Sequence, residues 1–261
     1  MPKHHVELGA GDGRRTLAVE ARDGQGSRGA PALLWLGGFR SDMRATKAEA
    51  LDELAARTGR RFVRFDYSGH GESGGRFEDG TLSRWLEDAR AVAERFAGER
   101  PVLVGSSMGG WIALLLARAL QGTPASPSGL VLVAPAVDFT ERLMWAALPE
   151  EARAAILDDG VYLRPSAYSP DPTPITRALI EDGRRHLLLG QPFTVGCPVH
   201  ILQGMRDPDV PWNHALELVE HLPGDPVQLT LVNDGDHRLS RPEDLERLAA
   251  AVEGVIAAGE R

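Results

Sequence analysis

One serine stands in a setting that favours nucleophilic chemistry. The stretch Gly105-Ser-Ser-Met-Gly109 has Ser107 at its centre, and it joins the apolar run at 102–104 to a helix-forming run that starts at Trp111. This pattern predicts a strand, a very sharp turn and a helix. Glycines two positions before and after the serine favour such a turn, because a side chain at either place would collide with the neighbouring strand or helix. We therefore expect an elbow that exposes the Ser107 hydroxyl.

A nucleophilic serine needs a base, and His237 follows the last predicted strand, at 227–232. If the strands are parallel, the loop that carries His237 shares a sheet edge with Ser107, so the two side chains can meet. We predict that His237 is the general base. The remaining histidines are expected in structural or surface roles, in helices, a strand, a glycine-rich loop or the N-terminus: His4, His5, His70, His186, His200, His214 and His221.

The imidazole in turn needs a carboxylate that fixes its tautomer and stabilises its charged form. Asp207 is the first acidic residue after the preceding strand, and we predict that it is this acid. Asp209 is the main alternative. Asp236 is adjacent to His237 but would have to fold back on it. The chain order Ser107, Asp207, His237 is the order of the nucleophile-elbow fold.

A tetrahedral oxyanion requires two backbone N–H donors, each typically worth ~3 kcal/mol in the transition state. We predict that Met108, the residue after the nucleophile, supplies one. The loop Gly37-Gly-Phe39 after an earlier apolar strand supplies the other, with Phe39 as the donor. A Gly-Gly pair after a strand is also typical of a simple tight turn. The expected chemistry requires neither a metal ion nor an organic cofactor.

Apolar strand-like runs alternate with helix-like segments along most of the chain, after an opening hairpin at 6–8 and 16–20. This alternation predicts an α/β fold with a mostly parallel central sheet flanked by helices. We expect residues 1–137 and 195–261 to form one core domain. Between them, residues 138–194 show helical segments with Pro-rich linkers and no predicted strand, which favours a small helical lid over the active edge.

Composition excludes several classes of function. The 261-residue chain has a net charge of −8 and no block of Lys or Arg, so nucleic acid is not an expected partner. A single cysteine, Cys197, excludes an internal disulfide. The N-terminus lacks an apolar signal segment, and the longest apolar run, 111–117, is too short to span a bilayer. We expect a soluble cytoplasmic protein that takes a small-molecule or acylated substrate; composition does not indicate an oligomeric state.

Five motifs together resemble the α/β-hydrolase superfamily over essentially the whole chain: Gly37–Asp42, Phe65–Ser73, Gly105–Trp111, Gly204–Trp212 and Gly235–His237. The phrases Pro165–Ser169 and Asp207–Trp212 are similar, more narrowly, to the small-lid group of mitochondrial palmitoyl-protein thioesterases and acyl-glucuronide esterases. The resemblance implies the α/β-hydrolase fold. It also places the nucleophile, acid and base of the family on Ser107, Asp207 and His237.

Residue pattern and resemblance together predict a serine hydrolase that cleaves carboxylic esters or acyl thioesters through an acyl-enzyme. The same three residues would also serve an acyltransferase or a perhydrolase, in which another nucleophile replaces water. A non-catalytic small-molecule-binding module is the alternative from a different class, but a receptor would not need all three residues.

Overall fold

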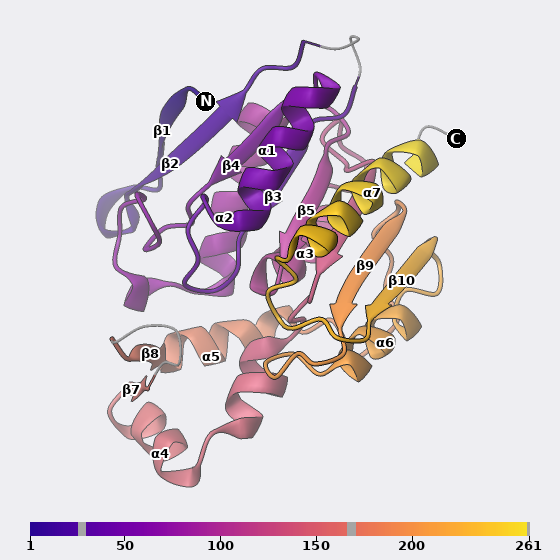
Figure 1. Cartoon of the computed structure of the whole chain (residues 1–261). Coiled ribbons are helices and arrows are strands. Elements are labelled where there is room, and N and C mark those ends of the chain that lie inside the picture. Colours follow the sequence, from indigo (N-terminus) through magenta and orange to yellow (C-terminus); the bar gives the residue numbers. More distant parts are fainter. Residues whose placement is uncertain (26–29, 166–170, 260–261) are drawn as a thin grey trace.

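Eight strands form one sheet at the centre of the molecule (Figure 1). The computed structural model describes residues 1–25, 30–165 and 171–259. The spatial order is β1-β2-β4-β3-β5-β6-β9-β10, and the six strands from β4 to β10 run parallel. Their bounds are β1 Lys3–Leu8, β2 Arg15–Arg22, β3 Leu33–Leu36, β4 Phe62–Phe65, β5 Val102–Ser106, β6 Gly129–Val133, β9 Val199–Gly204 and β10 Val227–Val232. The predicted opening hairpin is confirmed as the antiparallel pair β1–β2.

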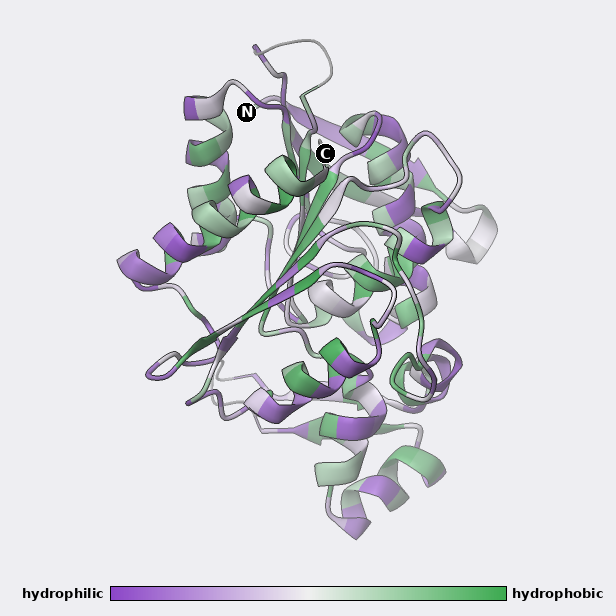
Figure 2. Cartoon of the chain, turned by 90° about the vertical axis from the view of Figure 1, so that its right-hand side faces the viewer, coloured by the Kyte–Doolittle hydropathy of each residue, from purple (hydrophilic) through white to green (hydrophobic). Residues whose placement is uncertain are grey.

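The middle strands are apolar because helices cover both faces of the sheet (Figure 2). Every residue of β3, β4, β5, β6 and β9 is buried. One hydrophobic core lies between the sheet and α2, α3 and α6, and a second lies between the sheet and α1 and α7. These helices are α1 Thr46–Thr58, α2 Leu82–Val92, α3 Met108–Leu120, α6 Trp212–Glu220 and α7 Pro242–Gly259.

The chain between β6 and β9 forms an insertion, placed in Figure 1 beyond the end of the sheet to which β9 and β10 point. It contains η4 Thr140–Met144, η5 Trp145–Ala147, α4 Glu150–Asp158, β7 Val161–Arg164, β8 Thr173–Thr176, α5 Arg177–Gly183 and η6 Arg184–His186. Asp138 joins the beginning of the insertion to its end, because its carboxylate accepts the backbone amides of Leu188 and Leu189 at 2.8 and 2.9 Å.

The expectation that this insertion has no strand is wrong. β7 and β8 pair antiparallel, separately from the main sheet, with Val161 opposite Thr176. The pair escapes detection because each strand has four residues and β7 is largely exposed, so it shows no apolar alternation. Pro174 in β8 fits such a small sheet, since proline is confined to edge strands. Residues 166–169 of the motif that begins at Pro165 lie outside the described residues.

The predicted elbow between β5 and α3 is confirmed. Ser107 has φ 54° and ψ −120°, a strained backbone conformation for a residue with a side chain. A Cβ on Gly109 would overlap the carbonyl oxygens of Leu36 and Gly37, and a Cβ on Gly105 would overlap the backbone of Gly109. The two glycines are therefore required by the close approach of α3 to the ends of β3 and β5.

Among the helices of the described residues, none combines the length and the apolar character that crossing a bilayer would require.

The elbow makes a prediction about stability. Gly109→Ala should lower the free energy of unfolding by about 3 kcal/mol, because the backbone of Leu36 and Gly37 would have to move. Gly254→Ala is the matched control: it lies in α7 with open space around it, and alanine should stabilise the helix by up to about 1 kcal/mol. Urea unfolding of both variants measures the difference. Equal stabilities would contradict the steric account.

Candidate active site

Three predicted side chains meet at the carboxyl edge of the sheet. The hydroxyl of Ser107 lies 3.1 Å from Nε2 of His237, and Nδ1 of His237 lies 2.8 Å from Oδ2 of Asp207. Ser107 stands between β5 and α3, Asp207 follows β9, and His237 follows β10. Because these three strands are parallel, they deliver all three residues to the same edge.

The Asp207 carboxylate is fully buried and firmly oriented. Its Oδ1 accepts the backbone amides of Asp209 and Val210, each at 2.8 Å. Its Oδ2 accepts Nε2 of Gln203 at 3.2 Å and faces His237. These donors stabilise a buried negative charge that water cannot reach. An acceptor at this place favours the tautomer with a proton on Nδ1, which leaves Nε2 free to accept the Ser107 proton.

Gln203 is a site residue that sequence reasoning missed. It is completely buried at the end of β9, and its amide also donates to the carbonyls of Gly204 and Val210. It therefore holds both ends of the turn that carries Asp207. A polar residue at the end of an otherwise largely apolar buried strand is the signal that could have indicated it.

The other two candidate acids occupy different places. Asp236 accepts the backbone amides of Arg238 and Leu239 at 3.1 and 3.0 Å, so it caps the histidine loop. Asp209 is exposed, and its carboxylate is one of three groups, with Asp207 and His237, whose ligand atoms lie within 4.8 Å of one another. This is the one potential metal-ligand cluster in the described ranges, but two of its members are already joined by the hydrogen bond from Nδ1 to Oδ2.

The loop after β3 lies against the elbow. A Cβ on Gly38 would be 3.5 Å from Cβ of Ser107, which shows how closely this loop approaches Ser107. Phe39, the next residue, packs its ring against those of Phe77, Trp85 and Phe139. Met108 is the first residue of α3, where an amide has no acceptor within the helix. Both predicted oxyanion donors thus belong to backbone that borders Ser107.

His70 holds the loop after β3 in place through a hydrogen bond. Its Nε2 accepts the backbone amide of Arg40 at 3.1 Å, and its Nδ1 lies 3.3 Å from the carbonyl of Ser68. Burial lowers the pKa of His70 to about 4, so the ring is neutral and can act as this acceptor at pH 7. Arg40 has φ 59°, and the hydrogen bond helps to hold that strained residue next to Phe39.

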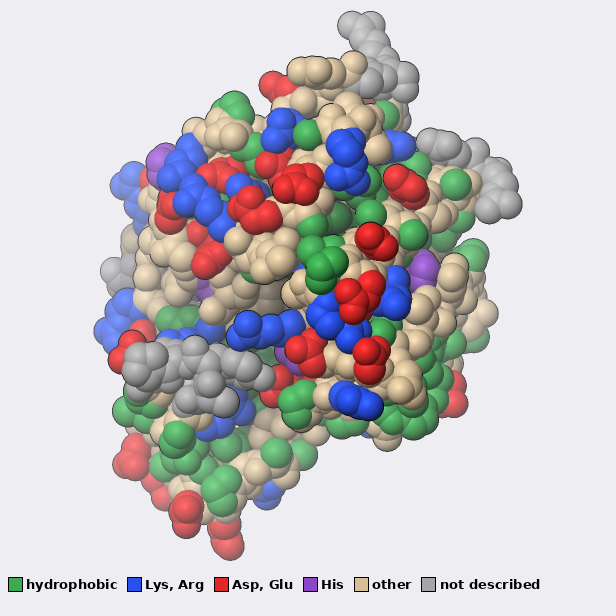
Figure 3. All heavy atoms as spheres, viewed as in Figure 1, with side chains coloured by type: hydrophobic (Ala, Val, Ile, Leu, Met, Phe, Trp, Pro, Cys, Tyr) green, Lys and Arg blue, Asp and Glu red, His purple; other side chains and the backbone are tan. Residues whose placement is uncertain are grey.

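A cleft of about 440 Å³ opens beside this loop, between the core and the insertion. Arg40, His70 and Phe77 line its core side, and Pro172 and Pro174 line its insertion side. The Arg40 guanidinium joins the two sides by donating to Oγ1 of Thr173 at 2.8 Å and to the carbonyl of Pro172 at 3.2 Å. Figure 3 shows acidic and basic side chains interspersed on this face of the molecule, without a continuous basic patch.

The alpha/beta hydrolase family matches residues 15–256, which is most of the chain. The chain therefore belongs to the alpha/beta hydrolase family, and its sheet and flanking helices have the fold of that family. The predicted fold class and the resemblance stated from the sequence are confirmed.

The chain is also similar to a curated protein and to two solved structures within this family. The mitochondrial palmitoyl-protein thioesterase ABHD10 of Bos taurus is 34% identical over 227 residues, which cover 87% of this chain and 73% of the relative. The structure of a putative hydrolase from Agrobacterium vitis S4 is similar with a TM-score of 0.94 at 52% identity, covering 98% of each chain. That of mouse alpha/beta hydrolase domain-containing protein 10 has a TM-score of 0.84 at 30% identity, covering 97% of this chain and 98% of the other. Since the thioesterases are named mitochondrial, the cytoplasmic location stays a prediction.

The buried His70 makes a prediction about pH. Its pKa is about 4 in the folded state against an ordinary 6.5, so the unfolded chain binds more protons between these values. His70 therefore contributes a loss of stability as pH falls from about 6.5 to about 4, amounting to roughly 3 kcal/mol. His70→Gln keeps an acceptor for Arg40 but does not titrate.

Urea unfolding of wild type and His70→Gln from pH 7 to pH 4 measures this contribution. The stability of wild type relative to the variant should fall across that range. The same substitution at the exposed His5 controls for the loss of a surface histidine. Parallel curves for wild type and His70→Gln would show that His70 is not the acid-sensitive group.

Proposed function

We propose that this protein is a serine hydrolase that cleaves carboxylic esters or acyl thioesters through Ser107, His237 and Asp207. The observation that carries the proposal is the continuous hydrogen-bond chain from the Ser107 hydroxyl through both nitrogens of His237 to the buried Asp207. Membership of the alpha/beta hydrolase family and relatives that are named thioesterases support the same class of reaction.

In the first half of the reaction, Nε2 of His237 takes the proton of Ser107 as its oxygen attacks the carbonyl carbon. Asp207 stabilises the imidazolium that forms, without taking its proton. The backbone amides of Phe39 and Met108 stabilise the developing oxyanion. His237 then gives the proton to the departing alkoxide or thiolate, which leaves as an alcohol or thiol, and an acyl group remains on Ser107.

In the second half, water replaces the leaving group. His237 removes a proton from this water, which attacks the acyl-enzyme, and the proton passes back to Ser107 as the carboxylic acid departs. The strained elbow suits both halves, because it keeps the serine oxygen at one position near the edge of the sheet.

The relatives also suggest a substrate class. We propose that acyl thioesters are among the substrates, because several relatives at 32 to 34% identity are named palmitoyl-protein thioesterases. The insertion between β6 and β9 acts as a lid in this proposal. Ser107, Asp207 and His237 do not line the cleft that Arg40 borders, so this proposal assigns that cleft no part in the reaction.

Labelling by a fluorophosphonate tests the nucleophile. Wild type should react at Ser107, and Ser107→Ala should neither label nor hydrolyse p-nitrophenyl and thioester substrates above the uncatalysed rate. Mass spectrometry of the labelled peptide identifies the site. A wild type that fails to label would point instead to a non-catalytic binding module. A Ser107→Ala variant that labels equally well would show that Ser107 is not the nucleophile.

A pair of isosteric substitutions tests the acid. Asp207→Asn should lower kcat roughly 10³- to 10⁴-fold, because an amide in place of the carboxylate favours the wrong tautomer of His237. Asp209→Asn, an exposed neighbour in the same turn, is the matched control and should retain most of the activity. If the large loss occurs at Asp209 instead, the assignment of the acid is wrong.

A further inference from the structure

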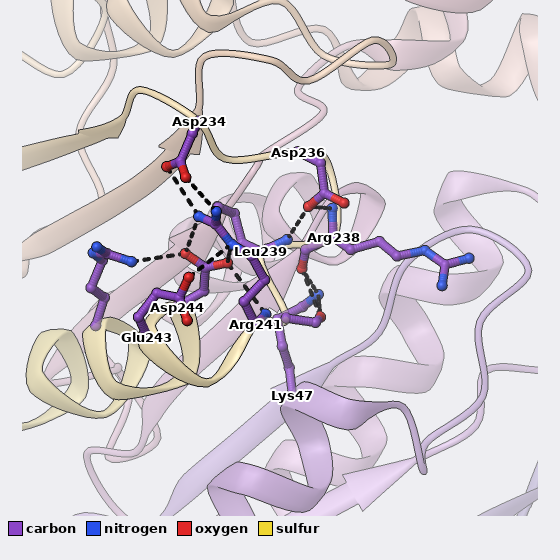
Figure 4. A network of polar contacts seen from close by, with 10 residues as sticks. Lys47, Asp234, Asp236, Arg238, Leu239, Arg241, Glu243 and Asp244 are labelled. Carbon is purple, nitrogen blue, oxygen red and sulfur yellow. Dashed lines mark hydrogen bonds and ion pairs between the residues drawn. The ribbon is translucent and has the colours of Figure 1, made fainter.

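The loop that carries His237 is held by a network of polar contacts (Figure 4). Asp236 accepts the backbone amides of Arg238 and Leu239, the two residues that follow His237. Leu239 has a positive φ of 42°, so the loop turns sharply there. Arg241 joins Asp234 to Asp244 at the start of α7, with contacts of 2.6 and 2.8 Å. These contacts link the loop to itself and to α7.

One member of the network, Lys47, comes from a helix that is distant in the sequence. Lys47 lies in the first turn of α1, and its Nζ donates to the carbonyl oxygen of Arg238, the residue after His237. Ser240 provides a second, longer contact at 3.4 Å. Figure 4 shows the Lys47 side chain extending from α1 to this loop. The lysine therefore ties α1 to the backbone next to the base.

Packing does not explain a lysine at this position. Its side chain is buried, with 8% of the residue exposed, and burial lowers its pKa to about 8. The carboxylates of Asp236 and Asp244 oppose that shift, and the guanidinium of Arg238 adds to it. An apolar side chain of similar length would fill the same space without the cost of burying an ammonium group.

The position of Lys47 in the chain connects two parts of the site. α1 begins directly after the loop that contains Phe39, and Lys47 is its second residue. The contact between Lys47 and Arg238 therefore joins α1, which follows the Phe39 loop, to the backbone next to His237. Loss of this contact would remove a hydrogen bond between α1 and the histidine loop, although Asp236 and Arg241 would still hold the loop.

We propose that Lys47 is a positioning residue for His237. By holding the Arg238 carbonyl, its ammonium keeps Nε2 of the imidazole directed at the Ser107 hydroxyl. This inference rests on the proposed hydrolase function. According to this inference, the orientation of the His237 imidazole depends on Lys47, a residue that contacts neither the substrate nor Ser107, His237 or Asp207.

Lys47→Met in the full-length protein tests the proposal. With a p-nitrophenyl ester, kcat should fall roughly 10- to 100-fold while KM stays within about twofold, because a small displacement of a catalytic group costs turnover and leaves substrate binding intact. The rate of fluorophosphonate labelling should fall in parallel. The melting temperature at pH 7 should not drop, since methionine removes a buried charge.

The matched control is Arg57→Met, which removes an exposed cation from the last turn of the same helix. It should leave kcat, KM and labelling unchanged. If Lys47→Met does not fold, Lys47→Leu, which also removes the N–H donor, should show the same fall in kcat.

The outcomes separate this inference from the proposed function. A folded Lys47→Met or Lys47→Leu with the kcat of wild type overturns the positioning role, while wild type and Ser107→Ala still differ. A fall in kcat matched by an equal loss of folded protein overturns it as well, because the role would then be structural. If wild type and Ser107→Ala do not differ, the proposed function fails and this inference falls with it.

Discussion

The close contact of backbone at the elbow is the constraint on which the site depends. α3 begins so near the end of β3 that Gly109 leaves no space for a side chain against the carbonyls of Leu36 and Gly37. This contact forces Ser107 into its strained conformation and brings Gly38 beside it. Ser107, the proposed nucleophile, and the loop that contains Gly38 are therefore positioned by one steric arrangement of main chain, which side-chain motion cannot relax.

The proposed base, His237, and the proposed acid, Asp207, are positioned by a different physical principle. Asp207 is a buried charge that must be satisfied by donors, and the amides of its own turn together with Gln203 supply them. His237 completes that set, so the hydrogen bond that orients the imidazole also relieves the burial of the carboxylate. Catalytic geometry and the stability of the turn are therefore coupled at Asp207.

Sequence analysis found the features that follow from local pattern. Apolar runs located the strands of the main sheet, and the rule that parallel strands end at one edge was sufficient to bring Ser107, Asp207 and His237 together. It missed β7 and β8, whose short strands lack periodicity, and it gave no role to Gln203 or Lys47. Gln203 donates to backbone carbonyls of its own turn, and Lys47 donates to the backbone of Arg238, which is far away in the sequence. The spacing of residue types along the chain does not predict such contacts.

Asp138 gives the insertion a fixed base. Its carboxylate binds the amides of Leu188 and Leu189 at the point where the chain leaves β6 and later returns. A loop closed in this way can gain, lose or exchange residues at its far end without altering the path of the chain into β9. The insertion can therefore vary in length and composition while the position of Asp207 is preserved.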